Sequence, residues 1–253
     1  MQKLLGKLRR AIEDFNLIQN GDKIAIGLSG GKDSITLLHL LKRYQSFSPE
    51  KFDLIAVTLN TMTGADFSPL ENVCSDINVP LYIYKTPIKE IVFDIRKEKN
   101  PCSLCANLRR EKNPCSLCAN LRRGALNNHS KKLGCNKIAL GHHKNDSIET
   151  LLMSMLYEGR VSCFSPRTYL NKADITIIRP MVYIDELAIK SMVKRYNLPI
   201  IKNPCPANGN TKRQYMKELT YTLEKDIPKI KDRLLGCLTN TNQINLWDKD
   251  KIQ

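Results

Sequence analysis

The residues of this chain best suited to chemistry lie in one turn, residues 29–34, with the sequence SGGKDS. An apolar segment at 23–28 precedes the turn and an apolar helical pattern follows it, so the turn joins a strand to a helix. Its two glycines permit close approach of the backbone, and the free N–H groups that begin the helix attract an anion. We therefore expect phosphate groups to bind here. The expected contacts are Ser29, Gly30, Gly31, Lys32 and Ser34.

The turn is not a Walker A loop. Ile26 stands where that loop has its first glycine, and Asp33 follows Lys32 where that loop has serine or threonine. The residues alone also allow a glycine turn without a ligand. The turn resembles the SGGxDS signature of the PP-loop ATP pyrophosphatases. This resemblance implies a Rossmann-like fold of the adenine-nucleotide α-hydrolase type and cleavage of ATP between its α- and β-phosphates, which adenylates a substrate oxygen.

A second polar segment, residues 141–146 with the sequence GHHKND, follows an expected strand at 137–140. Strands of a parallel sheet end at one edge, where ligands bind in open α/β folds, so we expect this segment beside the phosphate-binding turn. His142 can contact the nucleotide or orient a neighbour, and Asp146 can hold Mg²⁺ or accept a proton. The residues alone also allow Asn145 or Asp146 simply to cap the next helix.

The second segment resembles the GHHxDD element of the PP-loop enzymes that thiolate tRNA, with Asn145 where the first aspartate is usual. The expected catalytic residues are therefore Lys32, Asp33 and Asp146. Gly141 and His142 join the residues expected to bind the nucleotide.

Thirteen residues, EKNPCSLCANLRR, occupy 98–110 and are repeated without change at 111–123. Thirteen residues rotate an α-helix by about 1300°, so a continuous helix would turn its faces by about 220°. We therefore expect one copy to form a loop, with Pro101 and Pro114 as the points where the chain leaves and re-enters helix.

The duplication gives two Cys-x-x-Cys pairs, Cys102/Cys105 and Cys115/Cys118, among nine cysteines. Four thiolates could bind zinc, whereas one pair together with Cys205 could hold an iron–sulfur cluster with one open iron. A third interpretation is that these cysteines are thiols without a ligand. The other four cysteines, Cys74, Cys135, Cys163 and Cys237, have no cysteine or histidine partner nearby in the sequence and are expected to be buried apolar residues.

Four segments together resemble the tRNA 2-thiocytidine synthetases over residues 20–220: CSLCANLRRG at 115–124, KIALGHH at 137–143, IRP at 178–180, and Cys205. In that family two cysteines of a Cys-x-x-Cys and one distant cysteine hold a 4Fe-4S cluster. Only the second copy runs into LRRG, so the expected ligands are Cys115, Cys118 and Cys205. Cys102 and Cys105 keep the register from the preceding helix and stay as the alternative pair.

Strand and helix patterns alternate along the chain, which predicts a mostly parallel sheet with helices on both faces. The expected strands are 23–28, 52–59, 80–84, 137–140 and 175–178. The expected helices are 1–19, one after the turn at 29–34, 68–77, 87–97, 146–157 and 184–196. We expect an N-terminal helix (1–20), an ATP-binding domain (21–200) with a basic cysteine-rich insertion (98–123), and a helical C-terminal part with the Cys205 loop (201–253).

The chain has 253 residues and a net charge of +15, which favours a polyanionic partner. Ten lysines and arginines lie between Arg96 and Lys132, a stripe suited to a phosphate backbone or simply to solvent. No apolar run is long enough to span a membrane, so we expect a cytoplasmic protein.

These features together predict an ATP-dependent tRNA thiolase that uses ATP, Mg²⁺ and a 4Fe-4S cluster. The resemblance implies cytidine 32 of the anticodon loop as substrate, a sulfur donor such as a cysteine desulfurase or sulfide, and a homodimer. The alternatives are another PP-loop tRNA enzyme of the 2-thiouridine or lysidine type, a non-catalytic zinc-dependent RNA-binding protein, and an inactive PP-loop relative.

Overall fold

The computed structural model describes residues 1–61, 66–88, 91, 114–201, 212–240 and 242, and for 114–118 the backbone only. Six strands form one sheet in the order β3-β2-β1-β4-β6-β5. The strands are β1 Lys23–Gly27, β2 Asp53–Asn60, β3 Leu81–Lys85, β4 Lys137–Ala139, β5 Arg167–Leu170 and β6 Ile175–Ile178. Within the described ranges, no helix has both the length and the apolar character needed to cross a membrane.

The sheet is parallel except at one edge, which confirms the predicted fold class. β1 pairs in parallel with β2 on one side and with β4 on the other, so the carboxyl ends of β1 and β4 are neighbours. β5 pairs antiparallel with β6 and was not predicted. Its four residues, RTYL, are all exposed or half-buried, so they carry no continuous apolar signal.

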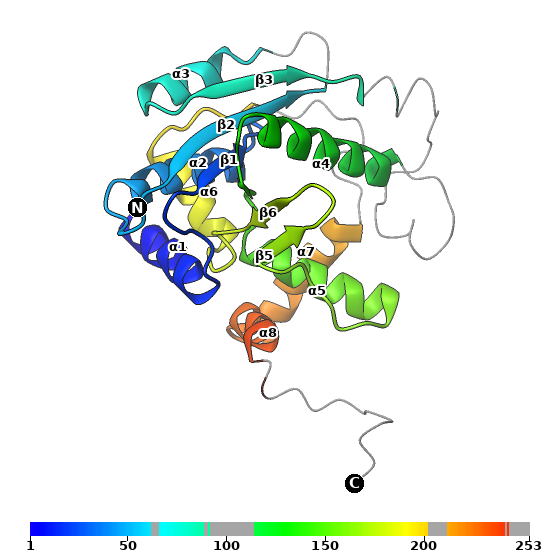
Figure 1. The fold of residues 1–253 in the computed structure, drawn as a ribbon. Helices are drawn as coiled ribbons and strands as arrows, with labels where there is room; N and C mark the ends of the chain where they lie inside the picture. Colours follow the sequence, from blue (N-terminus) through cyan, green and yellow to red (C-terminus); the bar gives the residue numbers. More distant parts are fainter. Residues whose placement is uncertain (62–65, 89–90, 92–113, 202–211, 241, 243–253) are drawn as a thin grey trace.

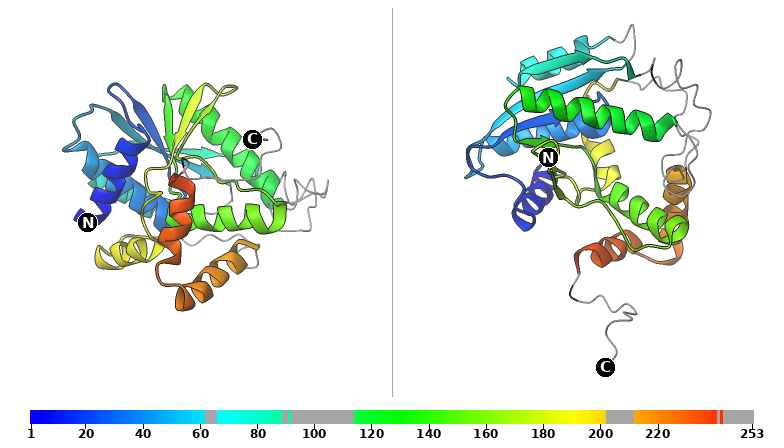
Figure 2. Two further views of the ribbon diagram at one scale, coloured as in Figure 1. Left: turned by 90° about the horizontal axis from the view of Figure 1, so that it is seen from below. Right: turned by 45° about the vertical axis from the view of Figure 1, so that its right-hand side comes forward.

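Helices cover both faces of the sheet (Figure 1). The helices are α1 Gln2–Asp14, α2 Lys32–Gln45, α3 Ser68–Asp76, α4 Pro114–Lys132, α5 Lys144–Glu158, α6 Glu186–Arg195, α7 Lys212–Asp226 and α8 Ile230–Thr239. Side chains of β1 alternate between two cores: Ile24 and Ile26 pack with α1, α2, α3 and α6, whereas Ala25 belongs to the core that contacts α4. α4 and α1 lie on opposite sides of the sheet (Figure 2).

The C-terminal helices α7 and α8 pack on α5 to form a third, smaller cluster below the sheet (Figure 1). Its buried residues are Ile148, Leu152 and Met153 of α5 and Met216 of α7. α7 begins directly after residues 202–211, which lie outside the described part of the chain. The helical C-terminal region is therefore attached to the sheet through α5.

α4 begins at Pro114, the residue at which the second copy of the duplication was expected to re-enter helix. Arg122 donates a hydrogen bond to the Thr61 hydroxyl, just beyond the carboxyl end of β2, at 3.2 Å. Cys115 and Cys118 lie near the start of α4. Through Arg122 this helix contacts the edge of the sheet that also carries the phosphate-binding turn. The first copy, 98–110, and most of the expected helix 87–97 lie outside the described residues.

The expectation that four isolated cysteines fill the core is wrong for two of them. Cys74 and Cys135 are buried, and burial raises the pKa of each thiol to about 11. Cys237 is exposed near the end of α8, and Cys163 is half-buried in the irregular segment between α5 and β5. Neither residue lies on the apolar face of a helix or strand, so the absence of a nearby ligand partner did not imply burial.

Candidate active site

The phosphate-binding turn leaves the carboxyl end of β1 and runs into α2, with Gly31 as the N-cap. No side chain caps this helix, so its first backbone N–H groups face outward for an anion. Gly30 has φ +79°, and a Cβ there would stand 2.9 Å from the Cβ of Ile201. The Ile201 N–H also donates to the Gly30 carbonyl oxygen at 2.9 Å. This position therefore requires glycine both for its backbone angle and for the chain that passes over it.

The two serines of the turn have different environments. Ser34 is buried, and its hydroxyl donates to the Gly31 carbonyl oxygen at 2.9 Å while accepting from the Ser29 N–H at 3.2 Å. Ser29 is exposed, with its hydroxyl 3.2 Å from that of Ser34. In this geometry Ser34 shapes the turn, and Ser29 is the serine that an incoming group can reach.

The second polar segment lies beside the turn, which confirms that the two share one edge of the sheet. A Cβ on Gly141 would approach the carbonyl carbon of Asp33 to 3.0 Å, so only glycine permits this contact. The imidazole of His143 lies between two carboxylates, with Nε2 3.6 Å from Asp33 and Nδ1 3.4 Å from Asp146. The His143 N–H also donates to Asp146 at 2.9 Å, so Asp146 caps α5 as well as facing the site.

The structure assigns different surroundings to the two neighbouring histidines. His142, the one singled out from the sequence, packs against the ring of Phe164 with centroids 5.0 Å apart. Burial lowers the pKa of His142 to about 4, which keeps it neutral near pH 7. His143 is the histidine that bridges the predicted carboxylates, and the sequence did signal it through the adjacent pair in GHHKND.

Lys32 is held by two carboxylates. Its ammonium lies 2.8 Å from Asp33 and 3.3 Å from Glu186, at the start of α6. Burial alone would lower the pKa of Lys32, but the hydrogen bond and charge of Asp33, together with Glu186, raise it. Asn145 positions this helix, because its amide oxygen accepts a hydrogen bond from the Glu186 N–H at 3.0 Å. Asn145 thus has a defined structural partner although it replaces the usual aspartate.

α7 adds two cations that the sequence did not single out. The guanidinium of Arg213 lies 3.5 Å from Asp146 and 3.2 Å from Glu149. One turn later, the ammonium of Lys217 lies 2.7 Å from Glu186. Nothing in the local sequence indicates which distant helix these two residues face.

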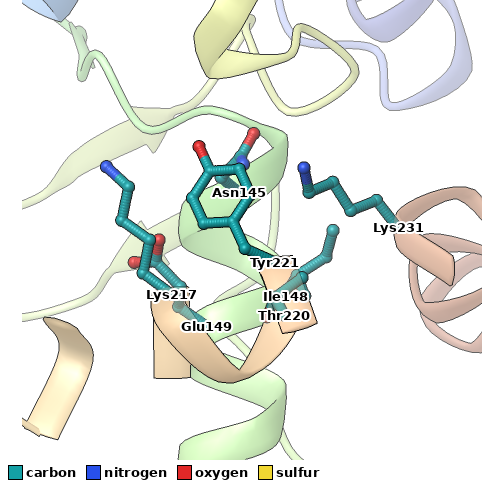
Figure 3. A pocket seen from close by; sticks show the side chains of 7 residues that line it. All are labelled: Asn145, Ile148, Glu149, Lys217, Thr220, Tyr221 and Lys231. Carbon is teal, nitrogen blue, oxygen red and sulfur yellow. The ribbon is translucent and has the colours of Figure 1, made fainter. Parts of the chain in front are cut away.

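Lys217 lines a small pocket between α5, α7 and α8, in which it lies beside Glu149 (Figure 3). The pocket's lining residues are Asn145, Ile148, Glu149, Lys217, Thr220, Tyr221 and Lys231. Burial raises the pKa of Glu149 to about 7, against the opposing charge of Arg213. Lys217 therefore contacts this pocket as well as Glu186.

Beyond β6 the site edge is positively charged. Arg179 lies over the ring of Phe164, 5.0 Å from its centroid, and also donates to the Thr168 hydroxyl. Burial, and then the nearby charge of Arg123, lower the pKa of Arg179 to about 10. Of the basic stripe, the described residues 119–132 place Arg122 and Arg123 at this edge; residues 96–113 lie outside the described part.

The predicted metal ligands fall mainly outside the described residues. Cys205, Cys102 and Cys105 are not described, and Cys115 and Cys118 are described by backbone only. The described helix contains the whole second pair, and residues three apart in a helix share one face. Among the described side chains, no group of three His, Cys, Asp or Glu could hold a metal ion.

The parallel sheet, the SGGKDS turn and the GHH segment at neighbouring strand ends define a PP-loop nucleotide-binding protein. A family model described as a PP-loop domain matches residues 2–222, so the chain belongs to this family.

Two curated relatives cover nearly the whole chain, and both are named tRNA-cytidine(32) 2-sulfurtransferase. The protein from Geobacter sulfurreducens is 35% identical over 98% of this chain and 93% of its own. The protein from Syntrophotalea carbinolica is 38% identical over 98% of this chain and 91% of its own. Among solved structures, the U34-tRNA thiolase NcsA from Methanococcus maripaludis, with its [4Fe-4S] cluster, matches with a TM-score of 0.72. It is 26% identical, over 98% of this chain and 80% of that chain.

Proposed function

We propose that this protein is an ATP-dependent tRNA sulfurtransferase that converts a cytidine of the anticodon loop to 2-thiocytidine. The observation that carries the proposal is the convergence of Lys32, Asp33, His143 and Asp146 at the carboxyl ends of β1 and β4. The full-length similarity to the cytidine(32) sulfurtransferases supports the choice of reaction.

The phosphates of ATP fit the uncapped N-terminus of α2, with Ser29, Gly30 and Gly31 forming the turn around them. Lys32 supplies positive charge, and Asp33 and Asp146 supply the carboxylate oxygens that Mg²⁺ prefers. In the first step the cytidine carbonyl oxygen attacks the α-phosphate, an O–P bond forms, and pyrophosphate leaves. The turn stabilises the charge that develops on the phosphate oxygens. In the second step sulfide attacks the ring carbon that carries this oxygen. A C–S bond forms, the C–O bond breaks, and AMP leaves with the oxygen.

Cys115, Cys118 and Cys205 form a donor set of three thiolates, which suits an iron–sulfur cluster. When bound, such a cluster would supply an open iron for the sulfur. The backbone of α4 carries Cys115 and Cys118, and Ile201, whose N–H donates to the Gly30 carbonyl oxygen, lies four positions before Cys205. Four residues of extended chain reach about 14 Å, so Cys205 is within that distance of Ile201.

The tRNA would approach over Arg122, Arg123 and Arg179, whose charges suit a phosphate backbone. The sulfur donor, a homodimer and a cytoplasmic location remain predictions from the sequence.

Release of AMP tests the ATP site. We expect Lys32→Met and Asp33→Asn each to reduce tRNA-dependent AMP release at least about a hundredfold, because each removes charge placed at the phosphates or metal. Lys190→Met is the control, because it removes a lysine but leaves the turn unchanged, and it should retain wild-type AMP release. Normal release in both active-site variants would contradict the assignment.

Iron content tests the ligand set. After anaerobic reconstitution, the double exchange Cys115→Ser with Cys118→Ser should lose the iron, whereas Cys102→Ser with Cys105→Ser should retain it. One bound zinc and no iron in the wild-type protein would instead support the zinc alternative, and iron retained in the first variant would assign the cluster to the first copy.

A uridine substrate is the second candidate, because the U34-tRNA thiolase shares the fold at 26% identity. Mass spectrometry of the modified nucleoside distinguishes the two, since 2-thiocytidine and 2-thiouridine differ in mass.

A further inference from the structure

Glu186 is a buried carboxylate that connects the ATP turn to the C-terminal helices. Its side chain is 5% exposed and touches three ammonium groups. Lys32 of α2 lies 3.3 Å away, Lys217 of α7 lies 2.7 Å away, and Lys190 of its own helix lies 3.5 Å away. Lys190 is 49% exposed, whereas Lys32 and Lys217 are about half as exposed, at 26% and 25%. The two sheltered cations therefore compete for one carboxylate with little screening by water.

The charge of Lys217 affects how strongly Glu186 holds Lys32. A triphosphate must draw the Lys32 ammonium toward the turn, away from Glu186. While Lys217 neutralises Glu186, that carboxylate holds Lys32 only weakly. Without the Lys217 charge, the whole charge of Glu186 acts on Lys32 and on the exposed Lys190.

We propose that Lys217 is a positioning residue of the ATP site, which keeps Lys32 available to the triphosphate by neutralising Glu186. The inference rests on the proposed function, since it takes the 29–34 turn to be the ATP site. Arg213, one turn earlier on the same face of α7, is paired with Asp146 on the other wall of the site. α7 therefore contacts both walls, although it lies outside the sequence motifs that define the ATP turn.

The test is calorimetric binding of α,β-methylene-ATP with Mg²⁺ to the full chain. We expect Lys217→Met to weaken binding about five- to tenfold, and Lys217→Arg, which keeps the charge, to bind like the wild type. Lys190→Met is the matched control: it removes a cation from the same carboxylate at an exposed position and should change the affinity less than about twofold.

The double variant Glu186→Gln with Lys217→Met decides the mechanism. Because Lys217 acts through Glu186, adding Glu186→Gln should restore wild-type affinity to Lys217→Met, even though it removes a further ion-pair partner. A purely structural role would instead make the double variant bind no better than the single one.

The inference is overturned if Lys217→Met binds like the wild type, or if its loss persists unchanged in the Glu186→Gln background. Persistence would mean that Lys217 contacts the nucleotide directly. If the wild-type protein itself does not bind the analogue, the proposed function fails at its first step, and the inference fails with it. Unfolding curves of every variant establish that the measured protein is folded.

Discussion

Two buried glutamates that pair with basic side chains of α7, Glu186 and Glu149, differ in their ionisation. Glu186 at the start of α6 is 4% exposed, and Glu149 in α5 is 6% exposed. Burial alone would raise both pKa values. At Glu186 the hydrogen bond from Lys217 and the charge of Lys32 outweigh burial and lower the pKa to about 2. At Glu149 burial, together with the charge of Asp146, prevails over Arg213 and Lys217 and raises the pKa to about 7.

The difference shows that neighbouring charges act together with burial to set the ionisation of these carboxylates. Glu186 pairs with three lysines, one of which, Lys32, also pairs with Asp33. Glu149 pairs with Arg213, which also pairs with Asp146, and the charge of Asp146 raises the Glu149 pKa. The molecule thus keeps a negative charge next to Lys32 at Glu186, whereas the pKa of Glu149 is about 7.

The largest effect is expected from Glu186→Gln. Lys32 and Lys217 lose their common partner, and because both are partly exposed we expect a loss of about 1–3 kcal/mol in the free energy of unfolding at pH 7. The Glu186 pKa is lowered on folding, so its contribution is complete above about pH 4.5 and is lost as the pH falls toward about 2. Urea unfolding at pH 7, 4 and 3 should show the difference from wild type shrinking. A difference that stays constant over this range would contradict the low pKa.

An intermediate effect is expected from Arg213→Met, which leaves Glu149 and Asp146 without their cation. The expected loss is about 1–2 kcal/mol at pH 8. It should be smaller at pH 6, where Glu149 is protonated and needs no cation. Urea unfolding of the same preparations at both pH values measures this, and an equal loss at pH 6 and pH 8 would assign the role of Arg213 to Asp146 alone.

The smallest effect is expected from Glu149→Gln. Because folding raises this pKa, the stability that the protonated carboxyl provides is complete below about pH 4.5 and is lost as the pH rises through about 7. The amide cannot ionise, so the variant should match the wild type at pH 4 and be more stable by about 0.5–1 kcal/mol at pH 9. Thermal unfolding of both proteins across this range checks the direction, and a difference between them that does not change with pH would show that the Glu149 pKa is not raised on folding.

The sequence was sufficient to predict those parts of the candidate site that lie at the ends of neighbouring strands. The SGGKDS and GHHKND segments follow two expected strands, and parallel strands must end at one edge, so the meeting of the two segments follows from the pattern alone. The choice between His142 and His143 did not follow, because it depends on which ring Phe164 covers.

The partners of α7 could not be predicted. Lys217 and Glu186 lie on different helices, and no spacing rule relates side chains of two helices that meet only after folding. The short edge strand β5 was not predicted either. Its backbone pairs with β6, but its side chains are half-buried or exposed and give no apolar pattern.

The most direct test of the central claim is thiolation of a defined tRNA. The full chain, reconstituted anaerobically with iron and sulfide, is incubated with unmodified tRNA, ATP and Mg²⁺, and the nucleosides and AMP are quantified by mass spectrometry. We predict 2-thiocytidine and AMP in equal amounts, and neither product with Asp33→Asn. Thiolation without AMP release, or equal thiolation by Asp33→Asn, would contradict the account.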